Sequence, residues 1–178
     1  MPNKILVSGR PGVGKTTLVR KVLASGVPLA GGFLTEEIRE RGRRVGFRVK
    51  DVHTGAEAVL AHVDHKGGPR VGKYGVDVAS FERIGVKALR EALGRDGCLI
   101  IDEIGKMEMC SEAFRAAVLA ALDAARPVLG TIPVFQHPFL RALPKRSDVT
   151  VVEVTVVNRE ALPQRLIGLL GRTDGVDS

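Results

Sequence analysis

Residues 9–17 form a glycine-rich run whose residue types and spacing suit the binding of phosphate groups. The run fits the phosphate-binding-loop pattern G-x-x-x-x-G-K-[ST] at every fixed position and continues by one residue: Gly9, Arg10, Pro11, Gly12, Val13, Gly14, Lys15, Thr16 and Thr17. Glycine is required because backbone N–H groups must close around phosphate oxygens, an approach that a Cβ would block. We expect Lys15 to reach the β- and γ-phosphates, Thr16 to ligate Mg²⁺ and Thr17 to donate to the α-phosphate.

An acidic pair supplies the second half of the chemistry. Asp102 and Glu103 directly follow the apolar run 98–101. A carboxylate at the end of such a strand holds Mg²⁺ directly or through water, so Asp102 joins Thr16 as a candidate metal ligand. Glu103 would face the γ-phosphate and polarise a water molecule. Because the activated nucleophile is then water, the pair favours hydrolysis. The alternative is an acidic pair that merely ends a strand at the surface.

Several other side chains are candidates for contacting the phosphates. Lys106 could place positive charge on the transferring phosphoryl group, although a solvated loop lysine is an equally good interpretation. Arg10, Arg141 and Arg146 are weaker candidates for that role. Thr131 ends an apolar strand and is either a polar sensor beside the γ-phosphate or a plain strand-end threonine.

The elements that must position these residues alternate between strands and helices. An apolar strand over 5–7 precedes the phosphate loop, and a helix is expected from there to about residue 25. Further strands are expected at 98–101, 127–132 and 149–156, with helices between them. Ser80, Ser111 and Asn158 are the expected helix caps. Residues 31–63 instead alternate as antiparallel strands around turns, which predicts an insertion that extends one edge of the sheet.

Composition limits the class of protein. The 178 residues are 44% hydrophobic and 26% charged, and they suffice for one globular domain, which we place at residues 1–171, with 172–178 as a frayed tail. No apolar run approaches the ~20 residues of a membrane span, and no signal peptide precedes the first strand, so we expect a cytoplasmic protein without a membrane partner. Two cysteines form no disulfide framework, and no residue pattern specifies an oligomeric state.

Two alternatives to simple hydrolysis remain open. The net charge of +7 and the arginines of the 31–63 insertion suggest a nucleic-acid-stimulated ATPase, although three glutamates interrupt them and the chain has one Tyr and no Trp to stack bases. The glycine-rich loop 64–75, which carries Arg70 and Lys73, could instead be the lid of a nucleoside or small-molecule kinase.

Three stretches together resemble the small nucleoside-triphosphatase family of thermophilic prokaryotes, which also includes the so-called cancer-related nucleoside-triphosphatase. They are the phosphate loop 9–17, Gly32-Phe33-Leu34-Thr35-Glu36-Glu37-Ile38-Arg39, and Asp102-Glu103-Ile104-Gly105-Lys106-Met107-Glu108. The phosphate loop is shared by many families, whereas the second and third stretches are much more specific. The resemblance extends to about residue 170.

The resemblance implies a three-layer α/β fold, a RecA-like P-loop nucleoside-triphosphatase with a mostly parallel sheet extended by an antiparallel β-hairpin insertion. It implies Mg²⁺-dependent hydrolysis of ATP, GTP, CTP and UTP to the diphosphate and phosphate, with little base preference. Two nucleotide-contacting segments are implied, Gly9 to Thr16 and a second one made of Leu99, Ile100, Ile101, Asp102, Glu103, Ile104, Gly105 and Lys106.

Overall fold

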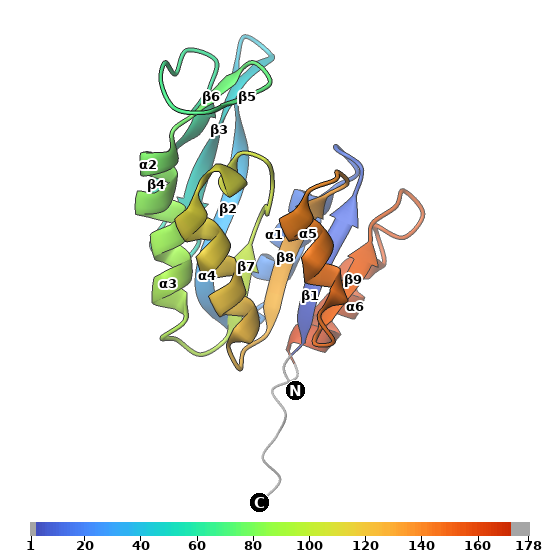
Figure 1. Cartoon of the computed structure of the whole chain (residues 1–178). Coiled ribbons are helices and arrows are strands. Elements are labelled where there is room, and N and C mark those ends of the chain that lie inside the picture. The colour runs from blue at the N-terminus through green and yellow to red at the C-terminus, as the bar shows by residue number, and fades with distance from the viewer. Residues whose placement is uncertain (1–2, 172–178) are drawn as a thin grey trace, which may run out of the picture.

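The computed structural model describes residues 3–171, and within that range nine strands form one continuous sheet (Figure 1). The strand order is β5-β6-β4-β3-β2-β7-β8-β1-β9. The strands are β1 (Lys4–Gly9), β2 (Leu29–Glu40), β3 (Arg43–Asp51), β4 (Glu57–His62), β5 (Arg70–Val71), β6 (Tyr74–Val76), β7 (Cys98–Ile101), β8 (Val128–Pro133) and β9 (Val149–Glu153). Among the described residues, no helix has the length and apolarity that crossing a membrane requires.

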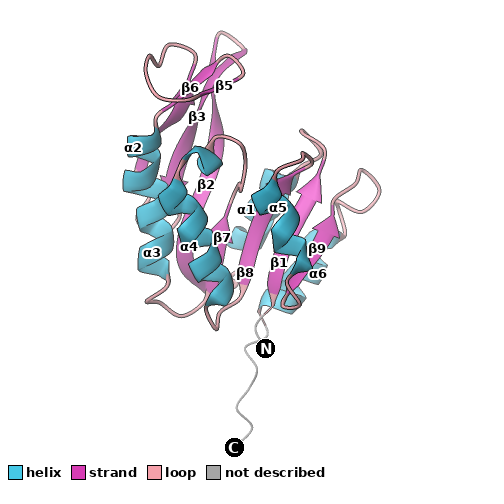
Figure 2. Ribbon diagram, in the orientation of Figure 1, coloured by secondary structure: helices cyan, strands magenta, loops and turns pink. Residues whose placement is uncertain are grey.

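Helices cover both faces of the sheet, which gives the three layers seen in Figure 2. The helices are α1 (Lys15–Ala24), α2 (Val78–Phe81), α3 (Lys87–Ala92), α4 (Glu112–Asp123), α5 (Pro138–Ala142) and α6 (Leu162–Leu170), with a π-helical turn at 82–86 and 3₁₀ turns at 108–110 and 143–145. Because side chains alternate across a strand, β1 contributes residues to the hydrophobic cores on both faces of the sheet. Ile5 and Val7 pack with α1 and α6, whereas Leu6 packs in the cluster that α3, α4 and α5 cover.

The parallel part of the sheet places the two predicted chemical segments at one edge. Strands β2, β7, β8, β1 and β9 all run parallel, and β8 lies between β1 and β7. The phosphate loop follows β1 and the acidic pair follows β7, so both leave the carboxyl ends of parallel strands, where open α/β sheets place ligands. The structure confirms the predicted three-layer α/β fold.

The antiparallel extension also agrees with the prediction. Strand β2 pairs with β7 in parallel through its first half and with β3 in antiparallel through its second half, and Arg41-Gly42 makes the turn. Gly32 is required at the branch point: its φ is 115°, and a Cβ there would lie 1.9 Å from the carbonyl oxygen of Ile100. The second half of β2 therefore projects past the end of β7.

Several local predictions were wrong. The 64–75 stretch is not wholly a loop, because β5 and β6 pair within it and add to the sheet edge. Asp77, not Ser80, caps α2, with its carboxylate accepting from the backbone N–H of Ser80. Ser111 does cap α4, through the backbone N–H of Phe114.

The closing elements are shorter than expected. β9 ends at Glu153, and α6 begins at Leu162, so Asn158 caps no helix. Asn158 instead fixes the connecting loop, since its side chain accepts from the backbone N–H of Thr155 and donates to the carbonyl of Glu153. The predicted frayed tail, 172–178, lies outside the described residues.

Candidate active site

The phosphate loop has the backbone that an anion cradle needs. Gly12 and Gly14 have φ of 77° and 110°, values that side chains other than glycine rarely adopt. Neither position has a heavy atom near the place of a Cβ, so conformation rather than crowding requires glycine there. The loop ends at the first turn of α1, whose unpaired N–H groups and dipole favour an anion.

Lys15 is held over this loop. Its side chain is 9% exposed, and its ammonium donates to the carbonyl oxygen of Gly9 at 2.7 Å and lies 3.9 Å from Oε2 of Glu103. The lysine therefore sits between the strand that opens the loop and the carboxylate that follows β7. A phosphate group entering the cradle would meet the ammonium on this side.

Asp102 lies where β7 and β8 end, beside the first turn of α1. The residue is 1% exposed. Its Oδ1 accepts from the hydroxyl of Thr131 at 2.7 Å and from that of Thr16 at 3.4 Å. Its Oδ2 is buried and has no hydrogen-bond partner among residues 3–171. Burial raises the pKa of Asp102, while the hydrogen bonds from Thr131 and Thr16 oppose that rise.

These residues fit a magnesium ion. A buried carboxylate oxygen without a partner is costly, and a cation is one way to satisfy it. Mg²⁺ prefers oxygen ligands, and the hydroxyl of Thr16 and the carboxylate of Asp102 supply them side by side. We therefore regard Thr16 and Asp102 as the residues that would hold the ion.

Glu103 and Glu108 form a second carboxyl pair next to Asp102. The Glu103 side chain is 32% exposed, whereas Glu108 is 5% exposed and accepts from the backbone N–H of Gly105 at 3.2 Å. Burial raises the pKa of both residues; Lys15 opposes the rise at Glu103, and the charge of Glu103 adds to the rise at Glu108. Glu103 is thus the accessible carboxyl group, and Glu108 is the buried one.

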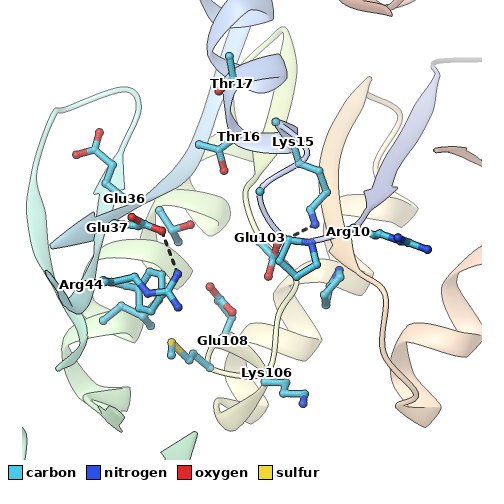
Figure 3. A pocket seen from close by; sticks show the side chains of 18 of the residues that line it. Arg10, Lys15, Thr16, Thr17, Glu36, Glu37, Arg44, Glu103, Lys106 and Glu108 are labelled. Atoms are coloured by element: carbon cyan, nitrogen blue, oxygen red, sulfur yellow. Dashed lines mark hydrogen bonds and ion pairs between the residues drawn. The ribbon is translucent and has the colours of Figure 1, made fainter. Parts of the chain in front are cut away.

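One pocket of about 860 Å³ joins the phosphate loop to the acidic segment and to the sheet extension (Figure 3). Its walls come from three parts of the chain. They are the loop and α1 (Arg10, Pro11, Gly12, Gly14, Lys15, Thr16, Thr17, Arg20), the end of β8 with the segments after β7 and β8 (Glu103, Lys106, Met107, Glu108, Pro133, Val134, Phe135) and the extension (Thr35, Glu36, Glu37, Arg44, Phe47, Leu60, Val71).

The structure does not bring every predicted site residue to this pocket. Leu99, Ile100, Ile101 and Ile104 are fully buried in the two cores and line none of it. They are apolar because the strand is covered on both faces, so we assign their side chains no contact with a nucleotide. Gly9, Val13 and Gly105 do not line the pocket either, and they shape the loops that do. Asp102 also does not line it, since the residue is buried beneath the hydroxyl groups of Thr16 and Thr131 that contact it.

The side chains proposed from the sequence to contact the phosphates do not all face the phosphate loop. The ammonium of Lys106 lies 4.7 Å from the centre of the Phe135 ring and is directed away from the phosphate loop in Figure 3. Arg146 is engaged by Asp123 and Asp148 at 2.8 and 2.9 Å, and neither it nor Arg141 lines the pocket. Thr131 is fully buried, and its hydroxyl donates to Asp102, so it holds the carboxylate rather than facing the pocket.

The two alternative functions depend on the basic side chains of the 64–75 stretch and on the arginines of the extension. Arg70 and Lys73 do not line it; Arg70 donates to the carbonyl of Lys73. On the extension, Arg39 and Arg44 both pair with Glu37, and Arg48 pairs with Glu57. The extension therefore carries acidic side chains among its basic ones rather than an unbroken basic surface.

Sequence reasoning missed the contribution of the extension to the pocket. Glu37, Arg44 and Phe47 belong to the insertion that the sequence predicts only as an extension of the sheet edge, yet all three line the pocket. The signal available in the sequence was strand length: β2 runs for 12 residues against four in β7, so its second half had to project beyond the ends of the central strands.

Comparison with known proteins gives a consistent family. A protein-family model described as NTPase matches residues 4–167. The chain is 43% identical over 167 residues to the nucleoside-triphosphatase THEP1 of Thermotoga sp. (strain RQ2), covering 94% of this chain and 95% of that protein. It is 47% identical over 166 residues to THEP1 of Thermofilum pendens, covering 90% and 91%.

Two solved structures of nucleoside-triphosphatases are also similar to this chain. The crystal structure of THEP1 from the hyperthermophile Aquifex aeolicus matches with a TM-score of 0.83 and 35% identity, covering 95% of this chain and 99% of that one. The solution structure of a human cancer-related nucleoside triphosphatase matches with a TM-score of 0.80 and 38% identity, covering 97% and 100%.

Proposed function

Because this chain belongs to the THEP1 nucleoside-triphosphatase family and is an enzyme of that class, we propose that it hydrolyses the γ-phosphate of ATP, GTP, CTP and UTP with Mg²⁺. The observation that carries the proposal is the single pocket in which the phosphate loop faces Glu103. We further propose that residues 1–171 act as one catalytic unit, since both segments leave the same sheet.

In this mechanism the loop N–H groups and Lys15 bind the β- and γ-phosphates and stabilise the charge that develops on them. The ammonium of Lys15 donates to the carbonyl oxygen of Gly9, and this hydrogen bond holds the side chain across the loop. Thr16 and Asp102 would hold Mg²⁺, which supplies neutralisation of the phosphate charge when it is bound. Thr131 donates to Oδ1 of Asp102, and Oδ2 has no hydrogen-bond partner among the described residues.

Glu103 is the residue that activates water. It is the carboxylate of the pocket that combines access to solvent with proximity to Lys15. A carboxylate accepts a hydrogen bond from the attacking water and orients it toward the phosphorus atom. The apolar wall of Phe47, Leu60 and Met107 limits the water that surrounds the reacting group.

Base tolerance is consistent with the composition of the pocket. Lys15, Thr16 and Thr17 suit the phosphates and the metal, and we assign no side chain to reading a base edge. We therefore expect the four nucleotides to be cleaved at comparable rates.

The test is phosphate release from each of the four nucleoside triphosphates with Mg²⁺, by the unmodified chain and by Lys15→Ala. Release from all four, abolished in the variant, supports the proposal. A chain that releases phosphate only when a nucleoside acceptor is present, and phosphorylates it, would be a kinase. Turnover that requires single- or double-stranded oligonucleotides would instead indicate a nucleic-acid-stimulated enzyme.

A further inference from the structure

The sheet extension carries an arginine into the pocket that holds the phosphate loop. Arg44, on β3, lines the pocket together with Lys15 and Glu103, and Figure 3 shows its guanidinium directed into the pocket. Strand β2 separates β3 from β7, and Arg44 pairs with Arg39, six residues beyond the Phe33 that pairs with Ile101 at the end of β7. Arg44 therefore lies on the part of the extension that projects past the end of β7, and it shares the pocket with Glu103, which follows that strand.

The guanidinium of Arg44 is held in one orientation by three neighbours. Its Nε donates to the hydroxyl of Tyr74 at 3.0 Å, and its Nη1 donates to Oε1 of Glu37 at 3.0 Å. Its central carbon lies 5.1 Å from the centre of the Phe47 ring. An arginine has about five N–H donors. The contacts found within residues 3–171 use one on Nε and one on Nη1, and those of Nη2 remain for a ligand.

The positive charge of Arg44 is not cancelled by its partner. Glu37 is shared with Arg39, whose Nη2 lies 2.7 Å from Oε2. One carboxylate therefore faces two guanidinium groups, and the cluster keeps a net positive charge. The hydrogen bonds to Tyr74 and Glu37 also raise the pKa of Arg44. A fixed cation with free donors and a planar fork is the form in which proteins bind phosphoryl oxygens.

The other cationic side chains of the pocket make different contacts. Arg20 is paired with Glu36 at 2.8 Å, and the ammonium of Lys106 lies over the Phe135 ring. Arg10 lines the pocket, but in Figure 3 its side chain extends away from Glu103 and Arg44. Lys15 belongs to the cradle itself. Arg44 is thus the cation that faces the cradle from the opposite wall.

We propose that Arg44 contacts the γ-phosphoryl oxygens of the bound nucleotide as the phosphate is transferred to water, serving as an arginine finger that the chain supplies from its own sheet extension. Tyr74 and Glu37 are its positioning residues. The inference rests on the proposed hydrolysis and adds to it the group that neutralises charge on the side opposite Lys15.

The experiment compares Arg44→Ala, Arg44→Lys and Arg43→Ala in the full chain. Arg43 is the exposed neighbour on the same strand, outside the pocket lining, and serves as the matched control. We expect Arg44→Ala to lower kcat for MgATP about 10²–10³-fold while MgADP binding is unchanged. Arg44→Lys should be intermediate, because lysine keeps the charge without the fork. The complex of MgADP with aluminium fluoride should weaken in parallel with kcat.

A second variant keeps the test decisive if Arg44→Ala folds poorly. Tyr74→Phe keeps the ring in the core and removes only the acceptor of Nε, and we expect it to lower kcat with KM unchanged. An Arg44→Ala or Arg44→Lys chain with the kcat of the unmodified protein would overturn the inference, as would equal losses of MgADP and aluminium fluoride binding. An unmodified chain that releases no phosphate would overturn the proposed function instead.

Discussion

Replacing Thr131 by valine removes one hydroxyl from a fully buried position and changes the shape of the side chain little. That hydroxyl donates to Oδ1 of Asp102 at 2.7 Å, whereas the remaining donor, Thr16, is at 3.4 Å. A hydrogen bond to a charged group contributes about 1.5–3 kcal/mol, so the variant leaves the carboxylate charge less well stabilised by that amount. The pKa of Asp102 should rise further above its ordinary value, and its affinity for Mg²⁺ should fall about ten- to a hundredfold.

The assay is phosphate release from ATP as a function of free Mg²⁺, with Thr131→Ser as the control that keeps the hydroxyl. We expect the valine variant to need about ten- to a hundredfold more Mg²⁺ for half-maximal rate, and the serine variant to resemble the unmodified chain. Unfolding by urea in the presence of a chelator checks that both variants fold. The reasoning is refuted if the Mg²⁺ dependence of the valine variant matches that of the unmodified chain.

Three further substitutions test the packing of the site. Gly105→Ala would place a Cβ 2.7 Å from Oε1 of Glu103 and 2.8 Å from Oε2 of Glu108. Since both oxygens end flexible side chains that can move aside, the variant should fold with an unchanged Tm but lose about 10²-fold in kcat. A normal kcat would contradict this. Glu108→Gln should flatten the pH dependence of stability. Burial raises the pKa of Glu108 in the folded state, so the folded state binds the extra proton and the free energy of unfolding falls as pH rises above about 4.3. Urea unfolding from pH 4 to 8 that gives both chains the same change of unfolding free energy with pH would contradict this. Gly32→Ala, with its Cβ 1.9 Å from the carbonyl oxygen of Ile100, should lower the free energy of unfolding by about 3 kcal/mol or more, and urea unfolding that shows no loss would contradict that packing.

The features that the sequence predicts well are those specified by neighbouring residues. The phosphate loop is a local backbone structure, and its glycines, lysine and threonine are fixed by spacing alone. The buried strand that ends at Asp102 is likewise a continuous apolar run, and the alternation of 31–63 indicates an antiparallel hairpin. The structure brings the first two segments to one pocket, as their chemistry requires.

The features that the sequence does not predict depend on which strands become neighbours. Thr131 contacts Asp102 because β8 lies beside β7, and the sequence does not contain that strand order. Arg44 lines the pocket because it pairs with the second half of β2, which projects past the end of β7. Helix starts fail for a related reason: Asp77 and Ser80 are both good capping residues, and the end of β6 decides between them.

The central claim is that Glu103 activates water for a nucleotide held by the phosphate loop. Glu103→Gln keeps the size of the side chain and removes the negative charge, so a single-turnover experiment with MgATP separates binding from cleavage. We predict that the variant binds MgATP as the unmodified chain does and cleaves it about 10²–10⁴-fold more slowly. Cleavage at the unmodified rate, with binding intact, would contradict the assignment.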